Sequence, residues 1–267
     1  MPEPVIVALD GIAIARGGRV LLENVDLALR AGVVAVIGAN GVGKTSLLRT
    51  IAGALAPAAG TVRVHGVDVR TLAARERART IALVEGNEPA FAALTVEDAV
   101  AAARFPYHRW WEWEQTPADE AAVAEALART ALDAFREREL GTLSAGERQR
   151  VWIALALAQR APVLLLDEPT AHLDLKASVQ TLQLLRDVAA GGALVIAVLH
   201  QLEEAAAFAD RVVVLAGSGV IADGAPAAAL TTTTIAGAFG IDVAVERRPE
   251  GLAFHRRAAA KRSLGTL

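Results

Sequence analysis

The sequence predicts an α/β fold with a mostly parallel sheet, an antiparallel β subdomain at the N-terminus and a helical subdomain inserted into the core. Two observations carry this prediction. Short apolar runs at residues 33–38, 163–166 and 193–199 alternate with helical patterns, as is typical of parallel strands buried on both faces. Residues from about 86 to 142 instead hold long alanine-rich helical patterns and no convincing strand, which indicates a helical insert.

The expected elements follow in order. Residues 5–29 predict β hairpins, with a turn at Gly17 and Gly18. The strand at 33–38 ends in glycine and leads through a glycine-rich loop into an amphipathic helix that ends near Gly53. The remaining expectations are a β segment at 61–69, a solvated helix or turn at 72–79, strands at 80–84, 163–166 and 193–199, and helices at 147–160 and 176–190.

The composition narrows the function classes. The chain has 267 residues, of which 54% are hydrophobic, enough for a sizeable core. A net charge of -3 argues against nucleic acid as the main partner, and the absence of cysteine excludes disulfides and thiolate metal sites. No signal peptide is evident, and the apolar run at 193–199 is far shorter than the ~20 residues that span a bilayer, so a cytoplasmic location is expected.

The segment GANGVGKT at residues 38–45 matches the phosphate-loop pattern G-x-x-x-x-G-K-[ST] between a predicted strand and a predicted helix. Glycines let backbone N–H groups curl round phosphates, and the helix N-terminus adds partial positive charge. Lys44 is expected to reach the β and γ phosphates and Thr45 to offer its hydroxyl to Mg²⁺. The candidate nucleotide-binding residues here are Gly38, Asn40, Gly41, Gly43, Lys44, Thr45 and Ser46.

Two adjacent carboxylates, Asp167 and Glu168, follow the apolar run 163–166. By themselves they indicate either a strand that ends at water or a strand that delivers carboxylates to a ligand crevice. The predicted phosphate loop favours the second interpretation, in which the strand delivers Asp167 and Glu168 to a ligand crevice. Asp167 is then expected to hold Mg²⁺ through water, and Glu168 to orient, or accept a proton from, the water that attacks the γ-phosphate. ATP and Mg²⁺ are the expected cofactors.

A second phosphate-binding device is predicted at LSAGERQR, residues 143–150. Ser144 and Glu147 have the spacing of a capping box at a helix N-terminus, and Gly146 leaves the backbone open to close approach. A helix start with a serine hydroxyl and free amides can bind phosphate. Taken alone, a serine that only caps its helix is the better interpretation.

Together these segments resemble the motifs of ABC ATPases. GANGVGKT, LSAGERQ, LLLDEP and HLD, followed by His200 after the strand, are similar to the Walker A, signature, Walker B, D-loop and switch-histidine motifs, in order across nearly the whole chain. The resemblance implies an ABC ATPase domain over residues 1–240, with the helical subdomain inserted at about 86–142. Residues 241–267 carry the basic pairs Arg247-Arg248, Arg256-Arg257 and Lys261-Arg262, so a solvated, partly ordered basic tail is expected there.

The resemblance also implies partners. It implies a head-to-tail dimer, in which Ser144 and Gly146 of one subunit close over the ATP on the phosphate loop of the other, with His200 on the γ-phosphate and Asp174 at the interface. The segments RFPYHRW, PTAHLDL and residues 199–226 are similar to ATPases of bacterial importers for iron-siderophores, haem and cobalamin. Such ATPases work with transmembrane permease subunits and a substrate-binding protein, peripheral on the cytoplasmic face of the membrane.

The sequence departs from the family pattern at three positions. The glutamine that usually follows the strand matching TIALV is replaced by Gly86, although Glu85, Asn87 or Glu88 can partly substitute for it. Arg16 stands where an aromatic residue usually stacks on adenine, and an arginine plane can also stack on a base. Ala145 stands where glycine is commoner in the signature. Nucleotide binding is expected despite these departures. They bear instead on the rate of ATP hydrolysis and on its coupling to a partner.

Three functions are compatible with these patterns. The first is the ATPase subunit of an importer, the second is a soluble ABC protein that acts on ribosomes or DNA, and the third is a nucleotide-gated module with little turnover, supported mainly by Gly86. Trp110, Trp111 and Trp113 lie in the insert, which in this family receives a helix of the membrane subunit. They form either a contact surface or part of the insert's own core.

Overall fold

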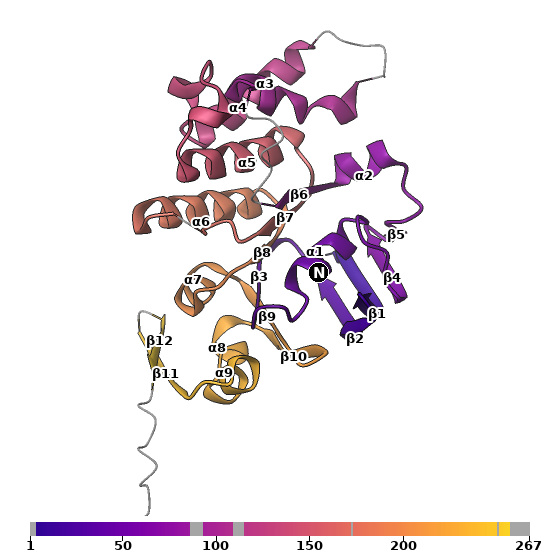
Figure 1. Ribbon diagram of the computed structural model, residues 1–267, viewed down its shortest axis with the longest axis vertical. Helices are drawn as coiled ribbons and strands as arrows, with labels where there is room; N and C mark the ends of the chain where they lie inside the picture. Colours follow the sequence, from indigo (N-terminus) through magenta and orange to yellow (C-terminus); the bar gives the residue numbers. More distant parts are fainter. Residues whose placement is uncertain (1–3, 86–92, 109–114, 172, 250, 257–267) are drawn as a thin grey trace, which may run out of the picture.

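The computed structural model of the protein describes residues 4–85, 93–108, 115–171, 173–249 and 251–256. Figure 1 shows a central sheet, with helices α3, α4 and α5 above it, an antiparallel sheet with α1 beside it and a C-terminal segment below. The predicted fold class, an α/β core with an antiparallel β part near the N-terminus and an inserted helical part, is confirmed.

The central sheet has the strand order β10-β9-β3-β8-β7-β6, with parallel neighbours from β9 to β6 and β10 antiparallel at one edge. The bounds are β3 Gly32–Gly38, β6 Ile81–Glu85, β7 Val163–Asp167, β8 Leu194–Val198, β9 Arg211–Ala216 and β10 Gly219–Gly224. The register pairs Glu85 with Asp167 and Asp167 with Val198. The C-terminal ends of β6, β7 and β8 therefore lie together at one edge of the sheet.

Both faces of the central sheet are covered. Alternate residues of β3 point to opposite faces, so Val34 and Val36 join the core shared with α1 (Lys44–Ile51) and the antiparallel sheet. Val33, Ala35 and Ile37 join the core on the other face, together with residues of α6 (Leu175–Ala190). Burial on both faces explains why these strands are continuous apolar runs rather than alternating ones.

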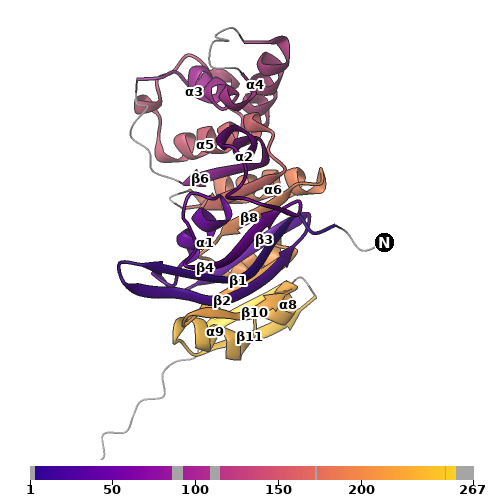
Figure 2. The same ribbon diagram turned by 90° about the vertical axis from the view of Figure 1, so that its right-hand side faces the viewer.

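The antiparallel sheet has the order β2-β1-β4-β5. Its strands are β1 Val7–Arg16, β2 Arg19–Leu29, β4 Ala59–Val64 and β5 Val67–Asp68. The predicted hairpin is confirmed: β1 and β2 are joined by Gly17 and Gly18, both with positive φ. Figure 2 shows this sheet lying across α1, and the fully buried Ile12, Ile14 and Leu22 belong to the same core as α1. The sheet thereby holds the start of α1 against β3.

The helical part lies between β6 and β7. It contains α3 Val96–Ala102, α4 Pro117–Arg129 and α5 Ala145–Gln159, and α2 Ala74–Thr80 precedes β6. Thr95, Thr116 and Ser144 cap the three helices, each accepting a hydrogen bond from the backbone N–H three residues on. Helix α5 contributes Val151 and other residues to the apolar core of this subdomain, and its C-terminal half leads back into the central sheet.

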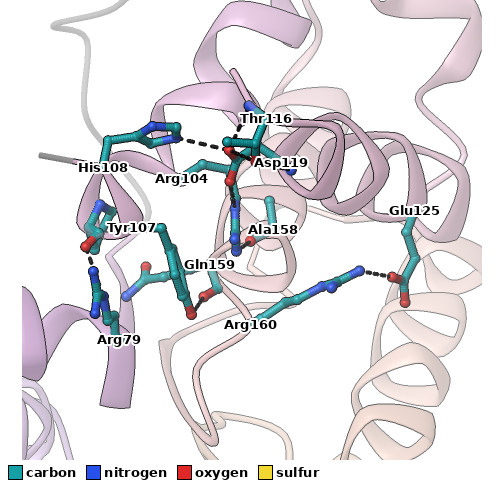
Figure 3. Close-up of polar contacts among 11 residues, drawn as sticks. Arg79, Arg104, Tyr107, His108, Thr116, Asp119, Glu125, Ala158, Gln159 and Arg160 are labelled. Atoms are coloured by element: carbon teal, nitrogen blue, oxygen red, sulfur yellow. Dashed lines mark hydrogen bonds and ion pairs between the residues drawn. The ribbon is translucent and has the colours of Figure 1, made fainter. Parts of the chain in front are cut away.

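A buried polar cluster ties the helical subdomain together (Figure 3). Arg104 Nε donates to Asp119 Oδ1 at 2.8 Å, and Arg104 Nη1 donates to the carbonyl of Ala158 in α5 at 2.8 Å. His108 Nε2 lies 3.0 Å from Asp119 Oδ2. Burial alone would raise the pKa of Asp119, but hydrogen bonds from Thr116 and Arg104 outweigh it and lower that pKa to about 2. The cluster thus joins the ends of α3, α4 and α5.

The C-terminal segment is more ordered than the sequence indicates. The last helices are α7 Leu202–Phe208, α8 Pro226–Ala229 and α9 Thr232–Phe239, followed by strands β11 Val243–Arg248 and β12 Gly251–Arg256, which form an antiparallel hairpin. Strand β12 packs on α7, where Leu252 and Phe254 contact the core. The sequence analysis expected only a solvated, partly ordered tail here. Residues 257–267 of that tail lie outside the described residues.

Candidate functional site

The phosphate loop connects β3 to α1. Gly38 has φ +154°, and a Cβ added to it would lie 2.5 Å from the carbonyl oxygen of Leu215, so the backbone there has room only for glycine. Gly43 caps α1 with φ +112° and offers no side-chain hydrogen bond to the first turn. The first N–H groups of α1 therefore remain available to an anion. Asn40 and Gly41 are exposed at the tip of the loop.

Lys44 is buried at the start of α1. Its Nζ donates to the carbonyl oxygens of Gly38 at 2.8 Å and Ala39 at 3.1 Å. Burial lowers the pKa of Lys44, while the nearby Glu168 and Asp167 act in the opposite direction. An ammonium group carries three N–H donors, so one donor is left for a phosphate oxygen. A phosphate would also favour the charged form of this lysine.

Asp167 and Thr45 meet beside the loop. The Thr45 hydroxyl donates to Asp167 Oδ2 at 2.6 Å, whereas Asp167 Oδ1 is buried and has no hydrogen-bond partner among the described residues. Burial raises the pKa of Asp167, and the negative charges of Glu168 and Glu85 raise it further, against the Thr45 hydrogen bond. A hydroxyl beside a carboxylate with a free oxygen suits Mg²⁺, which prefers oxygen ligands and commonly binds one or two carboxylates plus phosphates and water. The residues present therefore fit this ion.

Glu168 and His200 form a pair at the ends of β7 and β8. His200 Nε2 lies 2.6 Å from Glu168 Oε1, and both side chains are a little under half exposed. Glu168 has φ +53°, a left-handed conformation that is strained for glutamate and that concentrates at functional sites. The chain turns at Glu168, and the two carboxylates point in different directions. Asp167 contacts Thr45 of α1, and Glu168 contacts His200.

A second ion pair completes this edge of the sheet. Arg49 Nε donates to Glu85 Oε1 at 2.5 Å and Arg49 Nη2 donates to Glu85 Oε2 at 3.2 Å. The sequence analysis named Glu85 only as a possible substitute for glutamine and missed Arg49. The spacing alone places Arg49 on the same helix face as Thr45, because residues i and i+4 share a face, but it does not identify Glu85 as the partner of Arg49. Gly86 itself lies outside the described residues.

The second predicted device lies in the helical subdomain. The Ser144 and Glu147 capping box forms, with the Ser144 N–H donating to Glu147 Oε2 at 2.7 Å and the Glu147 N–H donating to Ser144 Oγ at 3.3 Å. Hydrogen bonding from the backbone N–H and the side chain of Ser144 lowers the pKa of the Glu147 carboxyl group. Ser144, Gly146 and Asp174 line one open cleft of about 540 Å³. In the parts of the chain described above, no hydrogen bond or ion pair joins this cleft to the phosphate loop.

The cleft is also basic and bordered by an apolar side chain. Arg129, Arg150 and Lys176 line it together with the signature residues. Asp174 caps α6 by accepting a hydrogen bond from the Ala177 N–H at 2.7 Å, and the next residue, Leu175, is 81% exposed. The cleft therefore combines the N-termini of α5 and α6 with three cations and the carboxylates of Glu147 and Asp174, and the exposed Leu175 follows Asp174 in the chain.

The other sequence-predicted residues lie apart from these contacts or outside the described chain. Arg16 is exposed at the end of β1, paired across the turn with Arg19. Ser46 is buried within α1. The residues that lie outside the described structure are Gly86, Trp110, Trp111, Trp113 and His172.

Comparison with protein families and with known proteins finds similarity to ATP-binding proteins of transport systems. The ABC transporter family model matches residues 22–171. The hemin import ATP-binding protein of Streptomyces coelicolor is 44% identical over 226 residues, which cover 84% of this chain and 80% of that protein. A cobalamin import ATP-binding protein of Halobacterium salinarum is 42% identical over 90% of this chain and 60% of its own length. The achromobactin transport ATP-binding protein of Dickeya dadantii is 37% identical over 89% of each chain.

Solved structures share the fold. An ABC transporter of metal-chelate type in an inward-facing conformation has a TM-score of 0.81 at 24% identity, covering 97% of this chain and 99% of the other. A dimeric ATP-binding cassette in a post-hydrolysis state, bound to ADP and phosphate, has a TM-score of 0.73 at 26% identity, covering 83% of this chain and 99% of the other.

Proposed function

The chain belongs to the ABC transporter family and is an ATPase subunit related to those of haem, cobalamin and siderophore importers, and we propose that it drives the import of a metal chelate. One observation carries the proposal for the chemistry. The phosphate loop, the Thr45–Asp167 contact and the Glu168–His200 pair lie at neighbouring strand ends of one sheet edge. Phosphate binding, metal binding and activation of water are thereby brought to one place.

In the proposed site, α1 binds the phosphates of ATP. The loop N–H groups and Lys44 hold the β and γ phosphates. Ser46, in the first turn of α1, is a further proposed phosphate contact. The Thr45 hydroxyl and Asp167 hold Mg²⁺, which, when bound, neutralises charge on the phosphate oxygens. The proposed phosphate-contacting residues are Gly38, Asn40, Gly41, Gly43, Lys44, Thr45 and Ser46. Arg16, which is exposed at the end of β1, is proposed to stack on the base.

Glu168 is the proposed general base. Its carboxylate orients the attacking water and accepts a proton from it at Oε1 or Oε2, and His200 holds the carboxylate through Nε2 at 2.6 Å. The strained backbone of Glu168 fixes the direction of its side chain, which limits the conformational freedom lost in reaching the transition state. We also propose that His200 contacts the γ-phosphate, and its position after the strand that neighbours β3 and β7 supports this role.

A second subunit completes the proposed site. Ser144 and Gly146 line their own cleft, away from the phosphate loop of the same chain, and the cleft offers amides and cations to an anion. Asp174 and the exposed Leu175 lie on its border and suit a protein contact. We therefore propose a head-to-tail dimer, formed with a second copy or a paired ATPase subunit, that encloses ATP between the phosphate loop of one subunit and the signature of the other.

A permease subunit is the proposed membrane partner. A cleft of about 280 Å³ lies between the helical subdomain and the end of β6, and it is lined by Leu83, Glu85, Ala102, Trp152 and other residues. A mostly apolar cleft of this kind suits a helix of the permease. No helix among the described residues is long and apolar enough to cross a membrane. The proposal places the chain on the cytoplasmic face of the membrane, with a substrate-binding protein as a further component.

Co-purification from the native membrane tests the importer proposal. The tagged chain is expected to recover a polytopic membrane protein and, with it, a substrate-binding protein, identified by mass spectrometry. Ala102→Arg places a charge in the cleft and is expected to abolish the recovery, whereas Ala190→Arg, on an exposed position at the end of α6, should leave it intact. Recovery of ribosomes in place of a membrane protein would overturn the proposal in favour of a soluble ABC protein.

A further inference from the structure

The last residue of β6, Glu85, lies beside the proposed metal site. Strands β6 and β7 are parallel neighbours, and their register pairs Glu85 with Asp167. Residues paired in this way point to the same face of a sheet. On that face α1 makes two contacts, because Thr45 reaches Asp167 and Arg49, one turn further on, reaches Glu85. Both carboxylates are thus held by the same face of α1.

The two carboxylates have acceptor sites that the protein does not fill. An ionised carboxylate has about four lone-pair sites. Arg49 takes one on each oxygen of Glu85, and no further donor to Glu85 is found in the part of the chain that the structure describes. Asp167 accepts from Thr45 on Oδ2, and its buried Oδ1 is without a partner among the same residues. Free acceptors on two neighbouring strand ends suit the water shell of a hydrated cation.

The charges at the ends of β6 and β7 also favour a hydrated cation. Asp167, its register partner Glu85 and the next residue, Glu168, bring three carboxylates to neighbouring strand ends, where Glu168 and Glu85 repel Asp167. The hydrogen bonds to Glu85 raise the pKa of Arg49, and the charge of Asp167 adds to that rise, so the guanidinium lies within the field of both carboxylates. A divalent cation would relieve the remaining repulsion between the carboxylates.

We propose that Glu85, positioned by Arg49, accepts a hydrogen bond from water bound to Mg²⁺ in the Mg-ATP complex, in place of the glutamine that this chain lacks at position 86. The proposal rests on the Mg-ATP site proposed above and adds one residue to it. The contact runs through water, because Arg49 already donates a hydrogen bond to each oxygen of Glu85 and holds the carboxylate away from direct coordination. Such outer contacts tune metal affinity without being ligands.

Binding of Mn²⁺ to the full chain loaded with a non-hydrolysable ATP analogue, measured by electron paramagnetic resonance, tests this role. Loss of an outer contact commonly weakens metal binding by about 10-fold or more, so Glu85→Ala is expected to weaken Mn²⁺ binding by about 10-fold. Binding of the analogue in EDTA, measured by calorimetry, should stay unchanged. Glu85→Gln keeps a side-chain oxygen that accepts from water, so it should restore Mn²⁺ affinity close to that of the wild type.

A purely structural role gives a different pattern. Glu85→Gln loses the charge of the ion pair but keeps an amide oxygen that can accept from Arg49, whereas Glu85→Ala loses the contact entirely. A purely structural role would therefore lower the thermal midpoint, more in Glu85→Ala than in Glu85→Gln, and leave Mn²⁺ affinity equal in both. Asp223→Ala is the matched control. It removes the ion pair of Arg211, which is similarly exposed and lies at the opposite edge of the central sheet, and it should not change Mn²⁺ affinity.

The outcomes separate the two proposals. If the wild type binds Mn²⁺ with the analogue and Glu85→Ala binds it equally well, the role of Glu85 is overturned and the ATP site stands. If the wild type does not bind the analogue with or without metal, the Mg-ATP site itself is overturned. Weaker Mn²⁺ binding in Glu85→Ala, with recovery in Glu85→Gln, supports the assignment.

Discussion

Replacement of Asp119 should destabilise the protein strongly, because its carboxylate is buried and charged. Its side chain is 3% exposed and that of Arg104 is 7% exposed. The pKa of Asp119 falls from 3.8 to about 2 in the folded protein. At 1.36 kcal/mol per pKa unit, the charged form contributes about 2 kcal/mol. Asp119→Asn should therefore cost about 2 kcal/mol at neutral pH, and Asp119→Ala about 3–5 kcal/mol, since it leaves Arg104 buried without its carboxylate partner.

The pH dependence follows from the direction of the shift. Because the pKa is lower in the folded state, the stabilisation is present above the unfolded value of 3.8 and is lost as the pH falls through the folded value of about 2. The difference between the wild type and Asp119→Asn should therefore shrink between about pH 4 and pH 2. Urea unfolding, followed by circular dichroism at several pH values, measures both effects.

Glu125→Gln provides the control. Glu125 pairs with Arg160 at 2.7 Å, but both side chains are about half exposed, so its removal should cost less than about 1 kcal/mol. If Asp119→Asn costs no more than Glu125→Gln at neutral pH, or if its effect does not change towards pH 2, the buried cluster does not hold the helical subdomain in the way described here.

Three further changes address the nucleotide site. Lys44→Ala removes a charge-assisted contact and should weaken ATP binding by about 10-fold or more in calorimetry; unchanged affinity would refute the phosphate-loop assignment. Gly38→Ala forces a Cβ to 2.5 Å from the Leu215 carbonyl and should lower the unfolding free energy in urea by about 1–3 kcal/mol, more than Gly41→Ala, whose Cβ meets nothing within 4 Å. His200→Ala should slow hydrolysis by about 10²-fold in a phosphate-release assay while ATP affinity is kept, and an unchanged rate would contradict its role.

Local patterns made much of this site predictable. The phosphate loop depends on residues within one strand, one turn and one helix, so the spacing of glycines and Lys44 is sufficient to place it. The same holds for Ser144, whose capping box is contained in four residues, and for the position of Asp167 and Glu168 at the end of a buried strand, although their role became clear only with the phosphate loop. In each case the determining contacts are near in sequence.

Features that depend on distant contacts were not predictable. The Arg49–Glu85 pair requires both the helix pitch of α1 and the register between β6 and β7, which no local pattern reveals. The left-handed backbone of Glu168 is likewise unexpected for a glutamate. The C-terminal hairpin is stable in this position because Leu252 and Phe254 pack on the core beside α7, whereas its short strands alone carry only a weak β signal.

The rate of Mg-ATP hydrolysis, measured for the wild type and for Glu168→Gln at several protein concentrations, tests the central claim most directly. The account predicts that the wild type turns over, that its specific activity rises with concentration as dimers form, and that Glu168→Gln binds ATP but does not hydrolyse it. Equal hydrolysis by both proteins would contradict the assignment of Glu168 as the base. A wild-type specific activity independent of concentration would contradict a site shared between two subunits.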